Sequence, residues 1–332
     1  MRLLKALRTQ ILEASKVSLV LFRIMVPVII AVKVLDELGL VGYIARAFEP
    51  VMGLVGLPGD MGIVWATSMI TNMYGGIVVF ASMAPQLHLT TAQITVIACM
   101  ILVAHSMPVE IAIARRAGIR TRFMIPFRLF SAILLGFILN QVCRLGGYLQ
   151  GRGEILWEAS GGDGGLGAWV LGQLRNLAAI FLIVLALIIL MKLLDRSGFT
   201  GLMNRALRPV LASLGIGGSA STVTILGMVL GISYGGGLII RAVESGRVPP
   251  RDVFFSMSLM GLSHSVVEDS LLMMSLGASI MGVLFARLAF TWPVIAILVI
   301  VVKKMPERLF YRWLFIPRTP GRASSPPETT AP

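Results

Sequence analysis

The sequence has 332 residues, of which 56% are hydrophobic and 14% are charged, and its formal net charge is +13. Soluble domains carry about 25% charged residues, and several apolar runs here reach the roughly 20 residues that span a bilayer. The composition therefore excludes a soluble globular protein. The basic residues lie in short clusters between apolar runs, which is typical of cytoplasmic loops beside anionic lipid and not of a nucleic-acid groove. We predict an all-α polytopic membrane protein whose partner is the lipid bilayer and not nucleic acid.

The apolar pattern divides the chain into five parts. Residues 1–16 form a basic amphipathic lead-in, and 303–332 form a basic tail whose Pro/Ser/Thr-rich end is predicted to be disordered. The regions 17–143 and 175–302 are predominantly apolar, and a Gly-rich linker, 144–174, joins them.

In the first apolar region, 17–35, 91–114 and 124–143 are predicted membrane-spanning helices. The run 42–55 is too short to span, so we place it in the membrane interface. The run 61–83 is apolar but contains a polar and Gly-rich centre, NMYGG, which indicates that its helix is interrupted.

The second apolar region repeats the first. Eleven identities share an offset of 159 residues. They are Lys33, Asp36, Gly39, Gly42, Arg46, Pro50, Gly56, His105, Ser106, Gly118 and Arg128, which recur as Lys192, Asp195, Gly198, Gly201, Arg205, Pro209, Gly215, His264, Ser265, Gly277 and Arg287. Composition alone would not produce this set, so the pattern indicates an internal duplication.

Loop charge predicts that the two repeats have opposite orientations. Four arginines crowd the loop 115–122, whereas the matching loop after Ser275 has no charged residue. Conversely, 82–92 has no Lys or Arg, and its counterpart around 241–251 holds three arginines. Because Lys and Arg accumulate in cytoplasmic loops, we predict inverted-topology repeats in the cell inner (plasma) membrane, with both termini in the cytoplasm.

The predicted sides of all the loops agree with one another only if the segments 61–83 and 219–243 each enter and leave the membrane on the same side. They are then re-entrant hairpins, with predicted non-helical tips at Tyr74-Gly75-Gly76 and Tyr234-Gly235-Gly236. Irregular backbone at membrane depth is tolerated where it lines a cavity or is buried in protein. Inverted repeats with interrupted helices are an architecture of secondary transporters.

Two further segments, 104–110 (AHSMPVE) and 263–269 (SHSVVED), place histidines and carboxylates at the ends of apolar runs. Pro108 predicts a break in the first helix, and the second copy has no proline. Ionisable groups within spans often mark solute or proton pathways. The alternative is a hydrogen-bonded pair that holds two helices together, and at the hairpin tips the alternative is close packing through glycine.

The candidate substrate-binding residues come from both pairs of segments. They are His105, Ser106, Glu110, His264, Ser265, Glu268, Asp269, Asn72, Tyr74, Gly75, Gly76, Ser233, Tyr234, Gly235 and Gly236. We expect the two histidines and three carboxylates among them to converge on one polar cavity between the repeats. The same five side chains offer a mixed nitrogen and oxygen ligand set for a divalent metal ion.

Four blocks, 56–59 (GLPG), 71–76 (TNMYGG), 104–110 and 264–269, resemble the nucleoside recognition (Gate) domain family. The resemblance covers about 17–302 as two Gate-like halves. That family is similar to parts of concentrative nucleoside transporters, the membrane domain of ferrous iron transporter B and the spore maturation proteins A and B. The resemblance implies a helical membrane fold with paired gates, and a nucleoside or metal ion as the solute.

We therefore expect a transporter or permease for a small, nucleoside-like polar solute. The alternatives are a divalent metal ion permease and a non-transporting membrane scaffold, and a homo-oligomer is left open. We expect no cofactor and no enzymatic activity. Residues 231–235 match the G-x-S-x-G motif, but without its strand-turn-helix context, and 56–59 and 215–218 lack the lysine of a P-loop.

The inverted charge bias generates a topological prediction. A reporter enzyme that is active only outside the cytoplasm should work when it is fused within 161–167 and fail when it is fused within 196–208, because the positive-inside rule puts these segments on opposite sides. Activity of the reporter at both positions would contradict the inverted arrangement.

Overall fold

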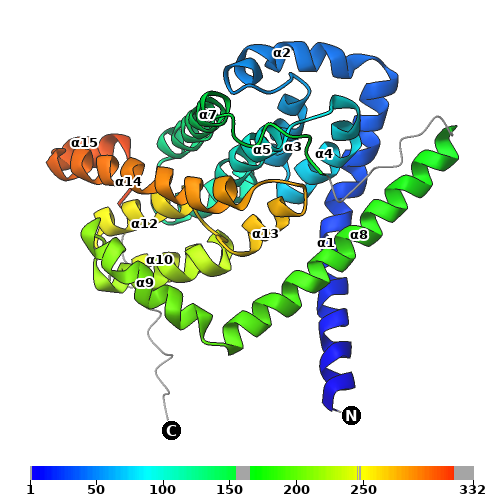
Figure 1. Ribbon diagram of the computed structural model, residues 1–332. Coiled ribbons are helices and arrows are strands. Elements are labelled where there is room, and N and C mark those ends of the chain that lie inside the picture. Colours follow the sequence, from blue (N-terminus) through cyan, green and yellow to red (C-terminus); the bar gives the residue numbers. More distant parts are fainter. Residues whose placement is uncertain (1, 155–164, 245, 247, 318–332) are drawn as a thin grey trace, which may run out of the picture.

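A computed structural model of the protein describes residues 2–154, 165–244, 246 and 248–317, and these residues form helices joined by loops, with no named strand among them (Figure 1). The first half contains α1 (Arg2–Glu37), α2 (Leu40–Leu54), α3 (Met61–Ile70), α4 (Met73–Leu87), α5 (Thr91–Val103), α6 (Met107–Arg116) and α7 (Thr121–Gly146). The second half contains α8 (Gly165–Arg196), α9 (Phe199–Ser213), α10 (Gly218–Leu230), α11 (Ile232–Glu244), α12 (Pro250–Leu262), α13 (Glu268–Met274), the π-helix η1 (Met281–Ala286), α14 (Arg287–Lys304) and α15 (Glu307–Trp313). The all-α prediction is confirmed.

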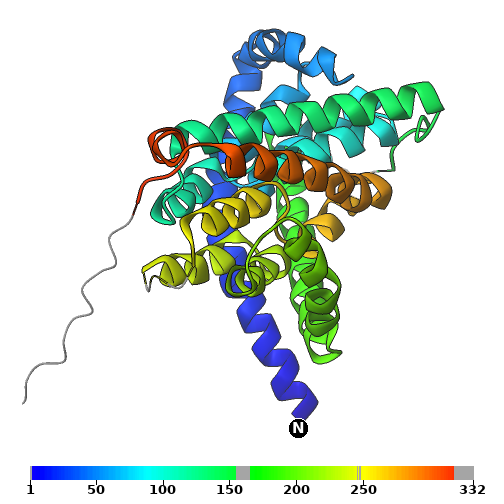
Figure 2. The ribbon, with the colours of Figure 1, turned by 90° about the vertical axis from the view of Figure 1, so that its left-hand side faces the viewer.

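Five helical stretches in the described residues are long and apolar enough to cross a membrane. They are Gln10–Glu37, Thr91–Arg116, Thr121–Gly146, Gly165–Leu194 and Met281–Lys304. The first extends beyond the predicted span, because the basic lead-in continues the same helix, and the N-terminal turns of α1 project from the rest of the structure (Figure 2).

The duplication seen in the sequence is also present in the backbone. Helices α9 and α12 begin and end 159 positions after α2 and α5, respectively. Glycines at matching positions adopt the same left-handed conformation, with φ of 73° at Gly56 and 74° at Gly215. The two halves therefore share one order of helices and turns.

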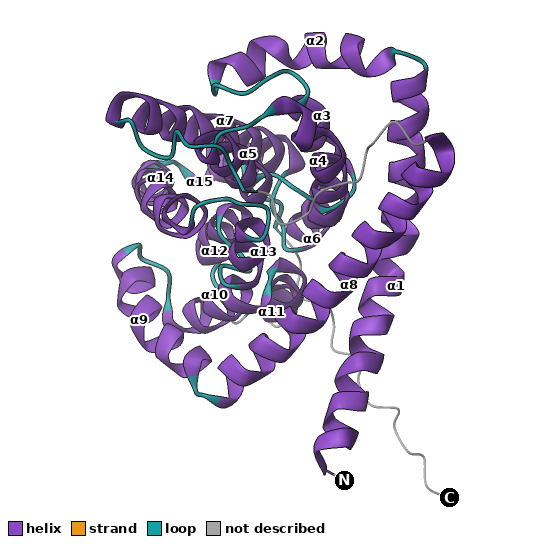
Figure 3. Cartoon of the chain, turned by 45° about the vertical axis from the view of Figure 1, so that its right-hand side comes forward, coloured by secondary structure: helices purple, strands orange, loops and turns teal. Residues whose placement is uncertain are grey.

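The first helices of the two halves, α1 and α8, run in opposite directions. In Figure 1, α1 rises from the N-terminus toward α2, whereas α8 descends toward α9. The two long helices pack against one another, and α2 and α9 lie at opposite ends of the structure in Figure 3.

The predicted tips at Tyr74-Gly75-Gly76 and Tyr234-Gly235-Gly236 are wrong in their backbone conformation, because both triplets lie in the first turn of a helix. The break between α3 and α4 comes earlier, at Thr71 and Asn72. The Asn72 side chain accepts a hydrogen bond of 2.9 Å from the Gly75 N–H, which caps α4 and starts it at Met73. In the second half, the break is Gly231, whose φ of 96° ends α10.

Both helices that carry a histidine motif are interrupted, as predicted for the first. The breaks cover 104–106 between α5 and α6 and 263–267 between α12 and α13. Pro108 occupies the first turn of α6. A backbone N–H has no acceptor within the helix at this position, so a proline there costs no helical hydrogen bond. The second break forms without a proline. Ser106 and Ser265 adopt left-handed conformations, with φ of 48° and 44°, at matching positions.

Helices extend into the predicted linker between the two halves. Helix α7 continues to Gly146 and α8 begins at Gly165, so the helices occupy both ends of the predicted linker 144–174. The middle of that linker and the predicted disordered end of the tail, 318–332, lie outside the described residues.

The two halves are joined at several places. The backbone N–H of Ile316 donates to the carbonyl of Gly118 at 2.7 Å, and that of Arg120 donates to Leu314 at 2.9 Å, so the segment after α15 pairs with the loop before α7. On another side, a Cβ added to Gly236 of α11 would overlap the Ile113 side chain of α6.

Close glycine packing within the α10–α11 hairpin generates a stability prediction. A Cβ at Gly235 would overlap the backbone of Gly227, whereas a Cβ at Gly237 would meet nothing within 4 Å. We expect Gly235→Ala to lower the free energy of unfolding by about 1–3 kcal/mol, as overpacking does. The matched control Gly237→Ala should be neutral or stabilising, because alanine favours a helix over glycine. Thermal unfolding in detergent would measure both, and equal stability of the two variants would contradict the packing.

Candidate functional site

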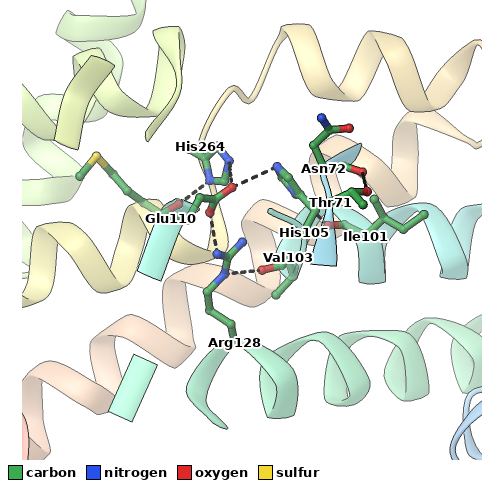
Figure 4. A network of polar contacts seen from close by, with 9 residues as sticks. Thr71, Asn72, Ile101, Val103, His105, Glu110, Arg128 and His264 are labelled. Carbon is green, nitrogen blue, oxygen red and sulfur yellow. Dashed lines mark hydrogen bonds and ion pairs between the residues drawn. The ribbon is translucent and has the colours of Figure 1, made fainter. Parts of the chain in front are cut away.

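The two histidine loops meet in the interior of the structure, and Figure 4 shows the side chains of His105 and His264 on either side of Glu110. The ring centroids of His105 and His264 are 5.1 Å apart, and the rings are tilted by 45°. His105 is 6% exposed and His264 is 3% exposed. Each ring lies in the break of its own helix, so the interruptions bring together two side chains that are 159 positions apart in the sequence.

Each imidazole is oriented by its own helix. The Nδ1 atom of His105 lies 2.9 Å from the carbonyl oxygen of Ile101, and that of His264 lies 2.8 Å from the carbonyl oxygen of Met260. A carbonyl oxygen only accepts, so each Nδ1 carries the hydrogen and donates it. In the neutral rings, each Nε2 then presents a lone pair.

Glu110, on α6, bridges the two halves. Its Oε1 atom lies 3.3 Å from Nε2 of His105 and 3.5 Å from Nε2 of His264. The residue is 3% exposed. One carboxylate oxygen from the first half therefore contacts a histidine from each half.

Arg128, on α7, supplies the counter-charge. Its Nη1 atom lies 2.6 Å from Oε2 of Glu110, as an ion pair whose angles fall outside the hydrogen-bond range. Its Nε atom donates to the Val103 carbonyl at 2.9 Å, and the side chain is fully buried. Pairing of this kind is what allows a charged carboxylate to be buried. Arg128 was not among the predicted site residues, although its recurrence as Arg287 was a signal that could have identified it.

Asp269 and Arg287 are the second-half counterparts of Glu110 and Arg128. Asp269 is 5% exposed. One of its carboxylate oxygens and one ring nitrogen from each histidine all lie within 4.8 Å of one another. Arg287 is fully buried; its Nη2 donates to Ser270 Oγ at 3.5 Å, and its Nε and Nη1 have no hydrogen-bond partner among the described residues. Of the two pairs, Glu110 with Arg128 forms the close ion pair in the described part of the chain.

Several predicted site residues have a different position or role. Glu268 is the first residue of α13 and is half-buried, and it is not part of the group formed by His105, His264 and Asp269. Ser106 contributes through its backbone, whose N–H donates to the Ser68 carbonyl of α3 at 2.9 Å. In the second half, the Val266 N–H next to Ser265 donates to Met228 of α10 at 2.9 Å, so each histidine loop is tied to its neighbouring hairpin.

The glycines of the first hairpin are closely packed. A Cβ at Gly75 would overlap the Thr71 side chain, and a Cβ at Gly76 would overlap Ser68. This contact favours the packing alternative over a close approach of ligand to backbone. Tyr74 is half-buried in α4. The side chains of Ser233 and Tyr234 lie outside the described residues.

His105, Glu110, His264 and Asp269 converge as predicted, but they form a closed cluster in place of an open cavity. Each is at most 6% exposed, and three of them are in direct contact. A pocket is present elsewhere, on the surface of α9, lined by Gly201, Arg205, Arg208, Pro209 and Ala212. None of its lining residues belongs to the histidine cluster.

The fold and the site define a class of protein: an all-helical membrane protein with a duplicated set of helices and a buried polar cluster where the halves meet. Residues 18–120 match the family described as Gate, nucleoside recognition, which confirms the predicted resemblance and includes His105 and Glu110. The chain is also similar to the uncharacterized membrane protein YvoD of Bacillus subtilis (strain 168). The two are 28% identical over 272 residues, which cover 80% of this chain and 85% of the relative. No solved structure matches.

The similarity to YvoD extends beyond one half. An alignment of 272 residues is longer than either apolar region, so it includes residues from both. The similarity between the two proteins therefore covers residues of both halves of this chain.

The buried ion pair generates a stability prediction. Arg128→Met leaves the Glu110 carboxylate without its counter-charge, and we expect it to lower the free energy of unfolding by about 3–5 kcal/mol. The double variant with Glu110→Met removes both charges and should recover most of the loss. Arg144→Met, at the exposed end of the same helix α7, is the matched control. Thermal unfolding in detergent gives the comparison, and losses that simply add in the double variant would contradict the pairing.

Proposed function

We propose that this protein is a membrane permease for a small polar solute, nucleoside-like as the family description suggests, and that the solute is held between the two halves. One observation carries the proposal: the Glu110 carboxylate of the first half contacts His105 and His264, one from each half. A hydrogen-bonded pair that only holds two helices together could form within one half of the chain. A binding site at the junction would instead take side chains from both halves.

The arrangement of the helices supports transport by inverted repeats. The opposite senses of α1 and α8 (Figure 1), and the separation of α2 from α9 (Figure 3), suit two repeats of opposite orientation in the inner membrane, with both termini in the cytoplasm. The short hairpins α3–α4 and α10–α11 are then re-entrant. Secondary transporters bind their solutes where such interrupted helices meet.

The chemistry of the cluster suits a neutral polar solute. The Glu110 carboxylate accepts hydrogen bonds, and imidazoles accept or donate them, which matches the hydroxyl groups of a ribose. The cluster is closed to solvent, so solute entry requires the halves to move apart on one side. We propose no enzymatic activity for the site.

The experiment is uptake of radiolabelled uridine and adenosine by proteoliposomes that contain the purified protein. We expect His105→Ala and His264→Ala each to reduce uptake by about tenfold or more, and the double variant to lose little further, because the histidines act in one site. His88→Ala is the control, since this third histidine is exposed at the end of α4.

The same vesicles separate the alternatives. Uptake of Mn²⁺ or Fe²⁺ with no nucleoside uptake would replace the proposal with a divalent metal permease. A well-folded protein that moves neither class of solute would favour a membrane scaffold.

A further inference from the structure

Three hydrogen-bond acceptors, one each from His105, His264 and Glu110, face one another at the centre of the cluster. Both Nδ1–H groups are used by backbone carbonyls, so both neutral rings direct an Nε2 lone pair at the Glu110 Oε1 atom, 3.3 Å and 3.5 Å away. A carboxylate oxygen is also only an acceptor. Acceptors at these separations are unfavourable unless a positive charge lies between them, either a second proton on a ring or a metal ion.

The spacing of these atoms matches metal coordination. Ligand bonds of roughly 2.0–2.1 Å around a tetrahedral ion place neighbouring ligand atoms about 3.3–3.4 Å apart. The two Nε2-to-Oε1 separations are 3.3 Å and 3.5 Å. The Asp269 carboxylate adds a third ligand atom within 4.8 Å of those offered by the two histidines.

The surroundings also resemble those of a metal site. Metal-ligating histidines usually donate their other ring N–H to a backbone carbonyl or a carboxylate, which orients the ring. His105 and His264 do so, to Ile101 and Met260, at matching positions of the two halves. Arg128 holds the Glu110 carboxylate in place, and the cluster is closed to solvent.

We propose that the two halves jointly bind one divalent transition-metal ion through Nε2 of His105, Nε2 of His264 and the Asp269 carboxylate, with Glu110 Oε1 at the fourth position. The mixed imidazole and carboxylate set selects ions of the zinc, cobalt and iron type over calcium and magnesium. The inference goes beyond the proposed function, because the ion takes the Nε2 and Oε1 atoms of the cluster whether or not the protein moves a solute, and a polar solute would then bind at the ion and not at the free side chains.

The test is titration of the full-length protein in detergent with Co²⁺, after removal of bound metal with EDTA. Visible d–d absorption reports tetrahedral coordination, and elemental analysis by mass spectrometry gives the stoichiometry. We expect one Co²⁺ per chain, and His105→Gln, His264→Gln or Asp269→Asn to weaken binding by about tenfold or more. His88→Gln should bind as the wild type does.

Measurements of folding distinguish a variant that has lost the metal site from one that has unfolded. Each variant is compared by size-exclusion chromatography and thermal unfolding, and only variants that match the wild type are interpreted. The proposal is overturned if the wild type itself binds neither Co²⁺ nor Zn²⁺ at millimolar concentration, because a proton then supplies the positive charge. It is also overturned if the folded cluster variants His105→Gln, His264→Gln and Asp269→Asn bind Co²⁺ as tightly as the wild type does. Absence of nucleoside uptake leaves the outcome of this titration unaffected.

Discussion

The structure depends on the burial of one carboxylate. Glu110 is 3% exposed in an interior that is otherwise dominated by apolar side chains, and an unpaired ionised carboxylate there would cost several kcal/mol. Its partners come from three other elements: Arg128 from α7, His105 from the break after α5 and His264 from the break after α12. Two of these partners belong to the first half and one, His264, to the second, so the same buried carboxylate also links the two halves of the chain.

The interrupted helices make that meeting possible. A continuous helix would keep each histidine on its outer surface, whereas a break lets the ring turn inward while its Nδ1–H caps a carbonyl of the preceding turn. The left-handed serines at 106 and 265 are uncommon conformations for non-glycine residues, and such strain is tolerated where the surroundings hold it. The backbone bonds from each loop to α3 or α10 provide that support.

The two copies of the histidine motif contribute to one polar cluster and do not form two separate ones. Both histidines, with the same backbone partners at matching positions, face a common point, but the charged pairs have diverged. Glu110 and Arg128 are in close contact, whereas the shorter Asp269 faces the histidines and Arg287 keeps two nitrogens without hydrogen-bond partners among the described residues. The two halves therefore share one polar centre, in which Glu110 has a close arginine partner and Asp269 has none among the ion pairs of the described residues.

The sequence by itself determined the features that are local or periodic. The 159-residue offset, the apolar spans and the break near Pro108 follow from residue patterns that act over a few turns of helix. Only the tertiary structure decided that Arg128 pairs with Glu110, that α4 starts at Met73 so that Tyr74 is helical, and that Gly75 and Gly76 pack closely against the preceding helix and turn. These outcomes depend on side-chain contacts between separate helices and on a single cap, and neither leaves a periodic trace in the sequence. The histidines were visible as a matched pair, but their 5.1 Å approach is a product of the fold.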